Sequence, residues 1–263
     1  MSLDLVDSLE ASRDSGRRPS PSVPPPLAPG VCQVWWAHAR DLHGRHEGLL
    51  NPTEAKRRAS YSLPPDHDVF TLGVVITRAV LGAHLQIAPE RVVIDRTCPD
   101  CARPHGWPRL PHAPDITISV SHSGSCVAVA FALGPRIGLD VESLHRTVRP
   151  GLADVVLSEP ERAALDRTTP GSQASGFLRY WVRKEAVLKA TGDGLRVPPA
   201  DVTVSAPDQA PTLLAWSNRP GLPSRMSLVD LASDSQHLAS LAVLDGLLTP
   251  QELDIRGILA ALQ

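Results

Sequence analysis

The stretch W-V-R-K-E-A-V-L-K-A-T-G-D-G at residues 181–194 determines how the rest of the sequence is interpreted. Its residue types favour a helix that ends at Gly192, and its spacing places Glu185 and Lys189 one turn apart. Trp181 lies one turn earlier on the same stripe. The simple alternative is an ordinary surface salt bridge, worth about 0.2–0.5 kcal/mol. Because a tryptophan beside such a pair is unusual on a plain surface, the stripe is a candidate functional face.

A second stretch, G-L-D-V-E at residues 138–142, has the alternation of a β-strand. Asp140 and Glu142 share one face of this strand, and the opposite face is apolar. Gly138 precedes them on their own face, where a glycine allows a ligand or a backbone to come close. A solvated acidic face is the alternative. Together with the glutamate and lysine of the helix, the two carboxylates predict a place for a hard metal ion and a charged phosphate ester.

Hydrophobic patterning around these stretches suggests an α/β protein with two halves of similar size, residues 31–135 and 136–245. We expect strands at residues 31–37, 91–95, 116–120, 126–133 and 137–141, and near 201–205, 212–216, 225–231 and 238–244. Residues 52–60 are basic and compatible with a helix. We expect helices over about 66–84, from the capping box at 158–161 to a break at 171–176, and over about 177–190.

The two ends of the chain are predicted to lie outside these halves. Residues 1–30 are rich in Pro and Ser, which is typical of a disordered leader. Residues 246–263 are interpreted as a C-terminal tail.

Composition narrows the class of protein. The 263 residues carry 26 basic and 28 acidic side chains, so general nucleic-acid or membrane binding is not expected. We find no apolar run close to the roughly 18–20 residues of a membrane-spanning helix. Acidic residues interrupt the N-terminal segment where a signal peptide would need an apolar stretch, which predicts a cytoplasmic protein.

The cysteine pair Cys98 and Cys101 forms a C-x-x-C. A zinc site would need two further ligands, and His105 and His112 are close in sequence. A redox pair would need a strand-then-helix setting, which the surrounding sequence does not offer. A reduced pair in a loop is the remaining interpretation.

The segment Ser121-His122-Ser123-Gly124 is predicted to form a turn between two strands. Hydroxyls, backbone N–H groups and an imidazole at a tight turn are suited to holding phosphate oxygens. A plain hairpin turn is equally compatible with this segment alone.

Taken in order, these motifs resemble the Sfp-type phosphopantetheinyl transferases. The resemblance covers about residues 31–245 and rests on S-H-S-G at 121–124, G-L-D-V-E at 138–142 and W-V-R-K-E-A-V-L-K-A-T-G-D-G-L at 181–195. C-P-D-C-A-R-P-H-G-W-P-R at 98–109 is similar to the loop before the family's S-H-S motif. The resemblance implies a pseudo-twofold α/β fold in which each half packs a small sheet on a long helix.

The resemblance also implies transfer of 4′-phosphopantetheine from coenzyme A to a carrier-protein serine, with release of adenosine 3′,5′-bisphosphate. Asp140, Glu142 and Glu185 match the family's magnesium ligands, with Mn²⁺ as an alternative metal. Glu185 also matches the proposed general base. Lys189 would neutralise charge on the pyrophosphate as its bridging bond breaks.

Further positions match contacts of bound coenzyme A. Ser121 and His122 match phosphate-contacting positions, and His105 belongs to the similar loop. Trp107 departs from the family, which often has lysine in its G-K-P, and its ring could pack on adenine. The family's usual arginines before the first long helix are also missing, so Arg57 is the candidate for the 3′-phosphate; a solvated basic helix face is the alternative.

By resemblance the protein is expected to be a monomer. Its partners would be acyl or peptidyl carrier domains of fatty-acid, polyketide or nonribosomal-peptide synthesis, docking through an acidic helix. Two alternatives remain at this stage. One is a non-catalytic module that binds coenzyme A or a carrier protein. The other is a metal-dependent nucleotide phosphohydrolase that uses the same carboxylates with water as nucleophile.

Overall fold

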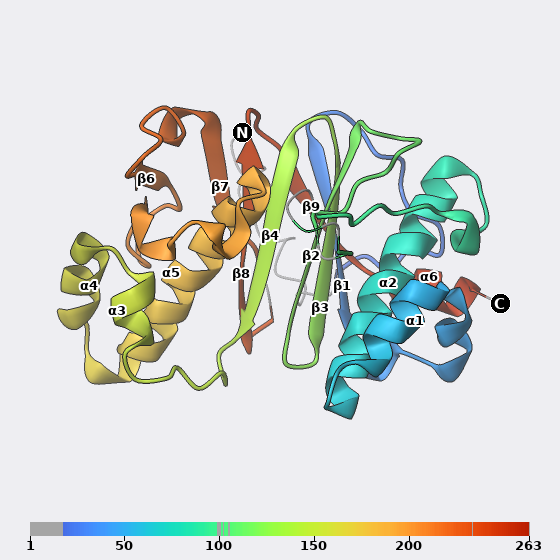
Figure 1. The fold of residues 1–263 in the computed structure, drawn as a ribbon, viewed down its shortest axis with the longest axis horizontal. Coiled ribbons are helices and arrows are strands. Elements are labelled where there is room, and N and C mark those ends of the chain that lie inside the picture. Colours follow the sequence, from blue (N-terminus) through green and yellow to red (C-terminus); the bar gives the residue numbers. More distant parts are fainter. Residues whose placement is uncertain (1–17, 99–100, 102, 105, 233, 263) are drawn as a thin grey trace, which may run out of the picture.

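The structure is a computed structural model that describes residues 18–98, 101, 103–104, 106–232 and 234–262. Figure 1 shows helices on two outer sides and β-sheets between them, which confirms the predicted α/β class. The helices on the right are α1 (Pro52–Ala59), α2 (Pro64–Leu85) and α6 (Arg256–Ala261). The helices on the left are α3 (Leu152–Val156), α4 (Glu159–Asp166) and α5 (Pro170–Thr191). Short 3-10 helices span Ala39–Asp41, Gly44–Leu49, Pro89–Arg91, Gly194–Arg196, Pro199–Asp201 and Pro223–Arg225.

Strands from both halves form two facing sheets and one small ribbon. The first sheet has the order β2 (Ile116–Ser123), β3 (Cys126–Leu133), β1 (Val31–His38), β9 (Thr249–Asp254). The second has the order β4 (Arg136–Ser143), β8 (His237–Leu244), β7 (Met226–Asp230). The ribbon pairs β5 (Val202–Val204) with β6 (Leu213–Trp216). Both large sheets contain an antiparallel three-strand unit, and in each unit the first strand in sequence lies beside the last.

Three apolar clusters hold these layers together. One lies between α2 and the first sheet around Trp35 and Phe131, and another lies between α5 and the second sheet around Phe177 and Tyr180. The third fills the space between the sheets. There β3 contributes only small side chains, and the facing strand β4 contributes large aliphatic ones. The small residues let the sheets approach, which brings strands of the two halves together.

The segment after residue 245 is not a loose tail. Strand β9 pairs with β1 in parallel, from Val31 opposite Thr249 to Trp36 opposite Asp254. Helix α6 then adds Ile258 and Leu259 to the core of the first half. The prediction of a tail was wrong because a six-residue strand beside a central strand leaves little hydrophobic signal of its own.

The described part of the leader also has a fixed course. The backbone N–H of Asp254 donates to the carbonyl of Pro19, and the Gln33 side chain donates to the carbonyl of Pro25 at 2.7 Å. Residues 18–30 therefore lie along the edge formed by β9 and β1. The expectation of disorder does not hold for them, and the rest of the leader lies outside the described residues.

Three local predictions were also wrong. Residues 91–95 form no strand, and only Asp95 makes an isolated bridge, to Arg109. Residues 171–176 do not break a helix, because α5 begins at Pro170 and runs through them. Gly176 belongs there because a Cβ would lie 2.9 Å from Leu165 of α4. The S-H-S motif is the end of β2, and the turn follows at Gly124, whose φ is +57°.

Helix α2 alone among the described helices has the length and apolar composition to cross a membrane. The expectation that the sequence holds no apolar run of this length was therefore wrong for residues 64–85. In the structure 67% of that apolar window is buried against the protein, as in the core helix of a globular fold.

Candidate active site

The predicted acidic strand faces the predicted helix stripe. β4 presents Asp140 and Glu142 toward α5, and both residues are buried. Gly138 makes this approach possible, because a Cβ there would overlap the backbone of Ala186 and Ala190. The glycine therefore serves a close contact with a helix backbone.

Lys189 connects the two elements. Its ammonium donates to Asp140 Oδ1 at 2.6 Å, to Ser121 Oγ at 3.0 Å and to the Leu139 carbonyl at 3.0 Å. The predicted i,i+4 partner Glu185 lies half-buried on the same stripe. Burial, and then the nearby Asp140 carboxylate, raise the pKa of Glu185, while Lys189 and Arg146 oppose the rise. A carboxyl with a raised pKa is suited to accepting a proton.

Glu142 has two partners that lie outside its strand. Ser123 donates its hydroxyl to Glu142 Oε2 at 2.6 Å, and the Arg146 guanidinium pairs with Oε1. Arg146 also packs over the ring of Trp181, with its Cζ 5.3 Å from the ring centroid. The ring of Trp181 therefore packs against Arg146 and holds this cation beside the acidic strand. Sequence reasoning missed Arg146, because it follows the strand in a loop with no periodic signal.

The donor set fits a hard cation only in part. Asp140 Oδ2 is buried and has no hydrogen-bond partner, as expected for an oxygen reserved for a ligand. The carboxylates of Glu142 and Glu185 are oxygen donors of the type that Mg²⁺ prefers. Among the described residues, however, no three His, Cys, Asp or Glu side chains are gathered closely enough to hold a metal as they stand. Lys189 and Arg146 neutralise two of the three carboxylates instead.

A cleft of about 910 Å³ opens beside Lys189. It runs between the loop of residues 96–109, strand β2, the start of β4 and the end of α5. Its walls are strongly basic, with Arg57, Arg96, Arg109, Arg136, Lys189 and Arg196. Such a cleft suits an elongated polyanion. Sequence reasoning missed Arg136, although it shares a strand face with Gly138 and Asp140 and the same alternation could have found it.

Trp107 lies in this cleft, and its ring packs against the guanidinium group of Arg136. The Cζ of Arg136 is 4.4 Å from the Trp107 ring centroid, and the indole N–H donates to the Ile118 carbonyl at 3.2 Å. The Nε of Arg136 is buried without a hydrogen-bond partner. Burial lowers the pKa of Arg136, against the opposing charge of Asp193. The predicted packing of Trp107 on adenine stays a prediction, and one face of the ring is already covered.

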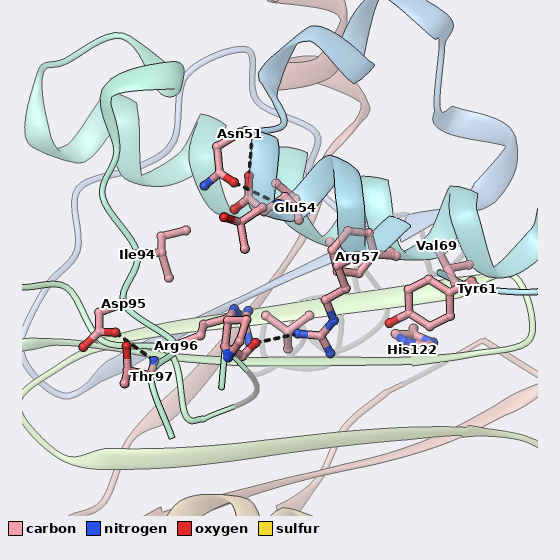
Figure 2. A pocket seen from close by; sticks show the side chains of 16 residues that line it. Asn51, Glu54, Arg57, Tyr61, Val69, Ile94, Asp95, Arg96, Thr97 and His122 are labelled. Atoms are coloured by element: carbon pink, nitrogen blue, oxygen red, sulfur yellow. Dashed lines mark hydrogen bonds between the residues drawn. The ribbon is translucent and has the colours of Figure 1, made fainter. Parts of the chain in front are cut away.

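A smaller cavity of about 340 Å³ adjoins the cleft at Arg57. Figure 2 shows Arg57 reaching from α1 into this space, with His122 just below Tyr61 at the right. The Arg57 guanidinium donates to the Pro104 carbonyl at 3.2 Å. Burial, and then the positive charge of Arg57, lower the pKa of Arg96, which lines the same space. Two guanidinium groups facing one cavity make a site for a phosphate-sized anion.

The remaining predicted site residues are placed as follows. Ser121 is buried between Asp140 and Lys189. His122 is exposed to solvent at the cavity wall; partial desolvation there and Lys189 lower its pKa. His105 lies outside the described residues. Cys98 and Cys101 line the cleft, and the described residues hold no zinc cluster around them.

Comparison with known proteins shows that the region with the acidic strand and α5 is similar to a family domain. Residues 136–242 match the family model of the 4′-phosphopantetheinyl transferase superfamily. The chain is 29% identical over 198 residues to the 4′-phosphopantetheinyl transferase HetI of Nostoc, covering 74% of this chain and 78% of that one. It is 33% identical over 97 residues to a 4′-phosphopantetheinyl transferase of Bacillus subtilis, covering 36% and 41%.

Other matches are shorter. The transferase AcpT of Escherichia coli is 32% identical over 116 residues, which is 44% of this chain and 55% of that one. A crystal structure of the holo-[acyl-carrier-protein] synthase of Thermotoga maritima aligns with 23% identity and a TM-score of 0.35, over 41% of this chain and 62% of that chain. The matched region, residues 136–242, contains both acidic-strand carboxylates and the whole of α5, so this part of the chain is similar to the 4′-phosphopantetheinyl transferase superfamily.

Proposed function

We propose that the chain transfers 4′-phosphopantetheine from coenzyme A to a serine of an acyl or peptidyl carrier domain. Phosphopantetheinyl transfer is the activity that the superfamily matched by residues 136–242 is named for. The observation that carries the proposal is that Asp140 and Glu185 lie beside Lys189, which lines a basic cleft. A cleft with that volume and basic lining suits a donor with a pyrophosphate and a further phosphate.

In this proposal a bound magnesium ion would be held by Asp140, Glu142 and Glu185. Asp140 offers its unpartnered Oδ2, while Glu142 would exchange Arg146 for the ion. When bound, the ion supplies charge compensation for the pyrophosphate oxygens.

The residues of the chain then perform the remaining steps. Glu185, with its raised pKa, accepts the proton of the attacking serine hydroxyl. The serine oxygen forms a bond to the phosphorus that carries pantetheine, and the bond from that phosphorus to the bridging oxygen breaks. Adenosine 3′,5′-bisphosphate leaves with the bonding electrons. Lys189 offsets negative charge that develops on the leaving phosphate.

The basic walls would hold the nucleotide part of the donor. Arg57 and Arg96 would bind the 3′-phosphate in the smaller cavity, and Arg136 would contact a second phosphate along the cleft. We further propose that the protein works as a cytoplasmic monomer and that the carrier docks through an acidic helix.

Intact mass spectrometry of an apo carrier protein, incubated with the chain, coenzyme A and Mg²⁺, tests this function. A mass gain of one phosphopantetheine with release of adenosine 3′,5′-bisphosphate is expected. Hydrolysis of coenzyme A without a carrier adduct would identify a phosphohydrolase instead. Binding of coenzyme A without turnover would identify a non-catalytic module.

A further inference from the structure

Strand β2 presents a row of serines to the edge of β4. Ser119, Ser121 and Ser123 alternate along β2 and share one face. Their hydroxyl oxygens accept hydrogen bonds from the backbone N–H groups of Leu139 at 2.9 Å, Val141 at 3.2 Å and Ser143 at 3.0 Å. These N–H groups belong to every second residue of β4 and point toward β2, away from β8. We call this row the serine ladder.

The serine ladder replaces a missing neighbouring strand. β4 is the edge strand of its sheet, with β8 on one side only. Buried edge N–H groups need acceptors. Hydroxyls from the other half of the molecule supply them, so the ladder is the polar seam between the two halves. Apolar or longer side chains at these positions would leave the N–H groups unsatisfied or hold the strands apart.

Two members of the ladder have a second partner. Ser121 donates to Asp140 Oδ1 at 2.9 Å, and Ser123 donates to Glu142 Oε2 at 2.6 Å. A hydroxyl has a single hydrogen to donate and two lone pairs to accept with. Since a backbone N–H occupies a lone pair in each case, the hydrogen is directed at the carboxylate. Ser119 makes the same backbone contact and has no carboxylate partner among the described residues.

We infer that Ser121 and Ser123 are positioning residues, which fix one oxygen of each acidic-strand carboxylate and so aim the other oxygen at the metal. The inference rests on the proposed function, because it requires a metal at these carboxylates. For Asp140 the outcome is visible: Oδ1 is held by Ser121 and Lys189, and Oδ2 is left without a partner. The ligands thus belong to one half, and their orientation is set by the other.

The test compares Ser119→Ala, Ser121→Ala and Ser123→Ala. All three remove one backbone contact from the seam, but only the last two release a carboxylate. The readouts are Mn²⁺ affinity, measured from the electron paramagnetic resonance signal of free Mn²⁺, and thermal unfolding. Loss of a hydrogen bond to a metal ligand typically weakens binding about 10–100-fold. We therefore expect Ser121→Ala and Ser123→Ala to lose at least about tenfold in Mn²⁺ affinity, and Ser119→Ala to stay within about twofold of wild type.

Ser123 gives the cleaner comparison because Ser121 also contacts Lys189. Ser123 is also less buried than Ser121, so its variants should fold even if Ser121→Ala does not. Ser123→Thr keeps the hydroxyl and should restore most of the affinity. Equal Mn²⁺ affinity in Ser119→Ala and Ser123→Ala, with wild type binding Mn²⁺ and modifying the carrier, would overturn the positioning role and leave the function intact. A wild-type chain that neither binds Mn²⁺ nor modifies a carrier would overturn the proposed function and this inference together.

Discussion

Helices α2 and α5 are both 22 residues long, and each buries a cation at the same position. Arg78 and Lys184 both lie fourteen residues after the first residue of their helix. Arg78 pairs with Glu54 at 3.0 Å, and Lys184 pairs with Glu161 at 2.5 Å. Both glutamates are the third residue of a short preceding helix, and both accept the N–H of that helix's N-cap residue at 2.8 Å.

Each cation also satisfies backbone carbonyls. Arg78 donates to the carbonyl of Val92 at 2.8 Å, and Lys184 donates to those of Val156 and Pro199 at 2.9 and 3.0 Å. In both halves the ion pair therefore joins a short helix, a long helix and a segment that follows the long helix. It fixes the rotation of the long helix about its axis.

The two halves differ in the side chains that their long helices direct toward the sheet, although both helices have the same rotation about their axes. After the cation, α5 continues with Glu185 and then Lys189, whereas the equivalent positions of α2 are Ala79 and Ala83. The sheet below follows the same division, with Asp140 on β4 and buried Trp35 on β1. One scaffold thus serves an apolar core in one half and a charged site in the other, and the four predictions below test this separation.

Replacing either buried cation should have the largest effect. Lys184→Met leaves the buried Glu161 without its partner, and Arg78→Met removes the buried partner of the partly buried Glu54. Breaking a buried ion pair typically destabilises a fold by about 3–5 kcal/mol, so the loss should be at the upper end for Lys184→Met. Denaturant unfolding measures the loss. Arg225→Ala, which breaks an exposed pair with Asp245, is the control and should change stability very little. A large loss in one half with none in the other would show that the two ion pairs are not equivalent.

Glu185→Gln should abolish the chemical step and leave the fold and coenzyme A binding intact. The amide keeps the shape of the side chain but does not accept a proton, so kcat should fall at least about 100-fold while coenzyme A still binds. Single-turnover kinetics and calorimetric titration measure the two quantities. Glu159→Gln changes an exposed glutamate of α4 and should leave both unchanged. Transfer above about a tenth of the wild-type rate would assign Glu185 a ligand role only.

The pair formed by Trp107 and Arg136 should affect donor binding and little else. Arg136→Ala should raise the KM for coenzyme A about tenfold at similar kcat, since a charge-assisted contact is worth about 1.5–3 kcal/mol. Trp107→Ala should act the same way because it removes the support of the guanidinium. The double variant should then be no worse than either single one. Additive losses would mean that the indole contacts the donor itself, as in packing on adenine.

The smallest expected effect is a pH dependence in the first half. Burial lowers the pKa of His84, at the end of α2, so the folded state disfavours the charged imidazole. The unfolded chain takes up this proton near its ordinary pKa of about 6.5. Stability from this group is complete above that pH and is lost as the pH falls below it toward the folded-state pKa. His84→Gln should flatten the decline between pH 7 and 5 in thermal unfolding, and an unchanged decline would assign it to other groups.

The sequence predicts those features of the molecule that depend on local patterns, and it does not predict contacts between residues that are distant in sequence. Asp140 and Glu142 follow from strand alternation, and Glu185 and Lys189 from helical spacing, because both patterns are local. Arg146 comes to Glu142 from a loop, and Arg96 joins Arg57 through a loop from another part of the half. Those contacts depend on tertiary structure and carry no periodic signal. The pairing of Arg78 with Glu54 also has no sequence pattern that predicts it. A single charged residue that is buried in the fold cannot be told from a surface residue until the position of its helix is known.

The pairing of β9 with β1 has a consequence for how the chain is made. The first half lacks its outer strand until residues 249–254 have left the ribosome, by which time the second half is complete. Until then the open edge of β1 is a template for pairing with other chains. Folding of the first half therefore finishes last, although its residues are synthesised first. Fusions or deletions at the C-terminal end should accordingly disturb the opposite half, remote in sequence, before they disturb the acidic site.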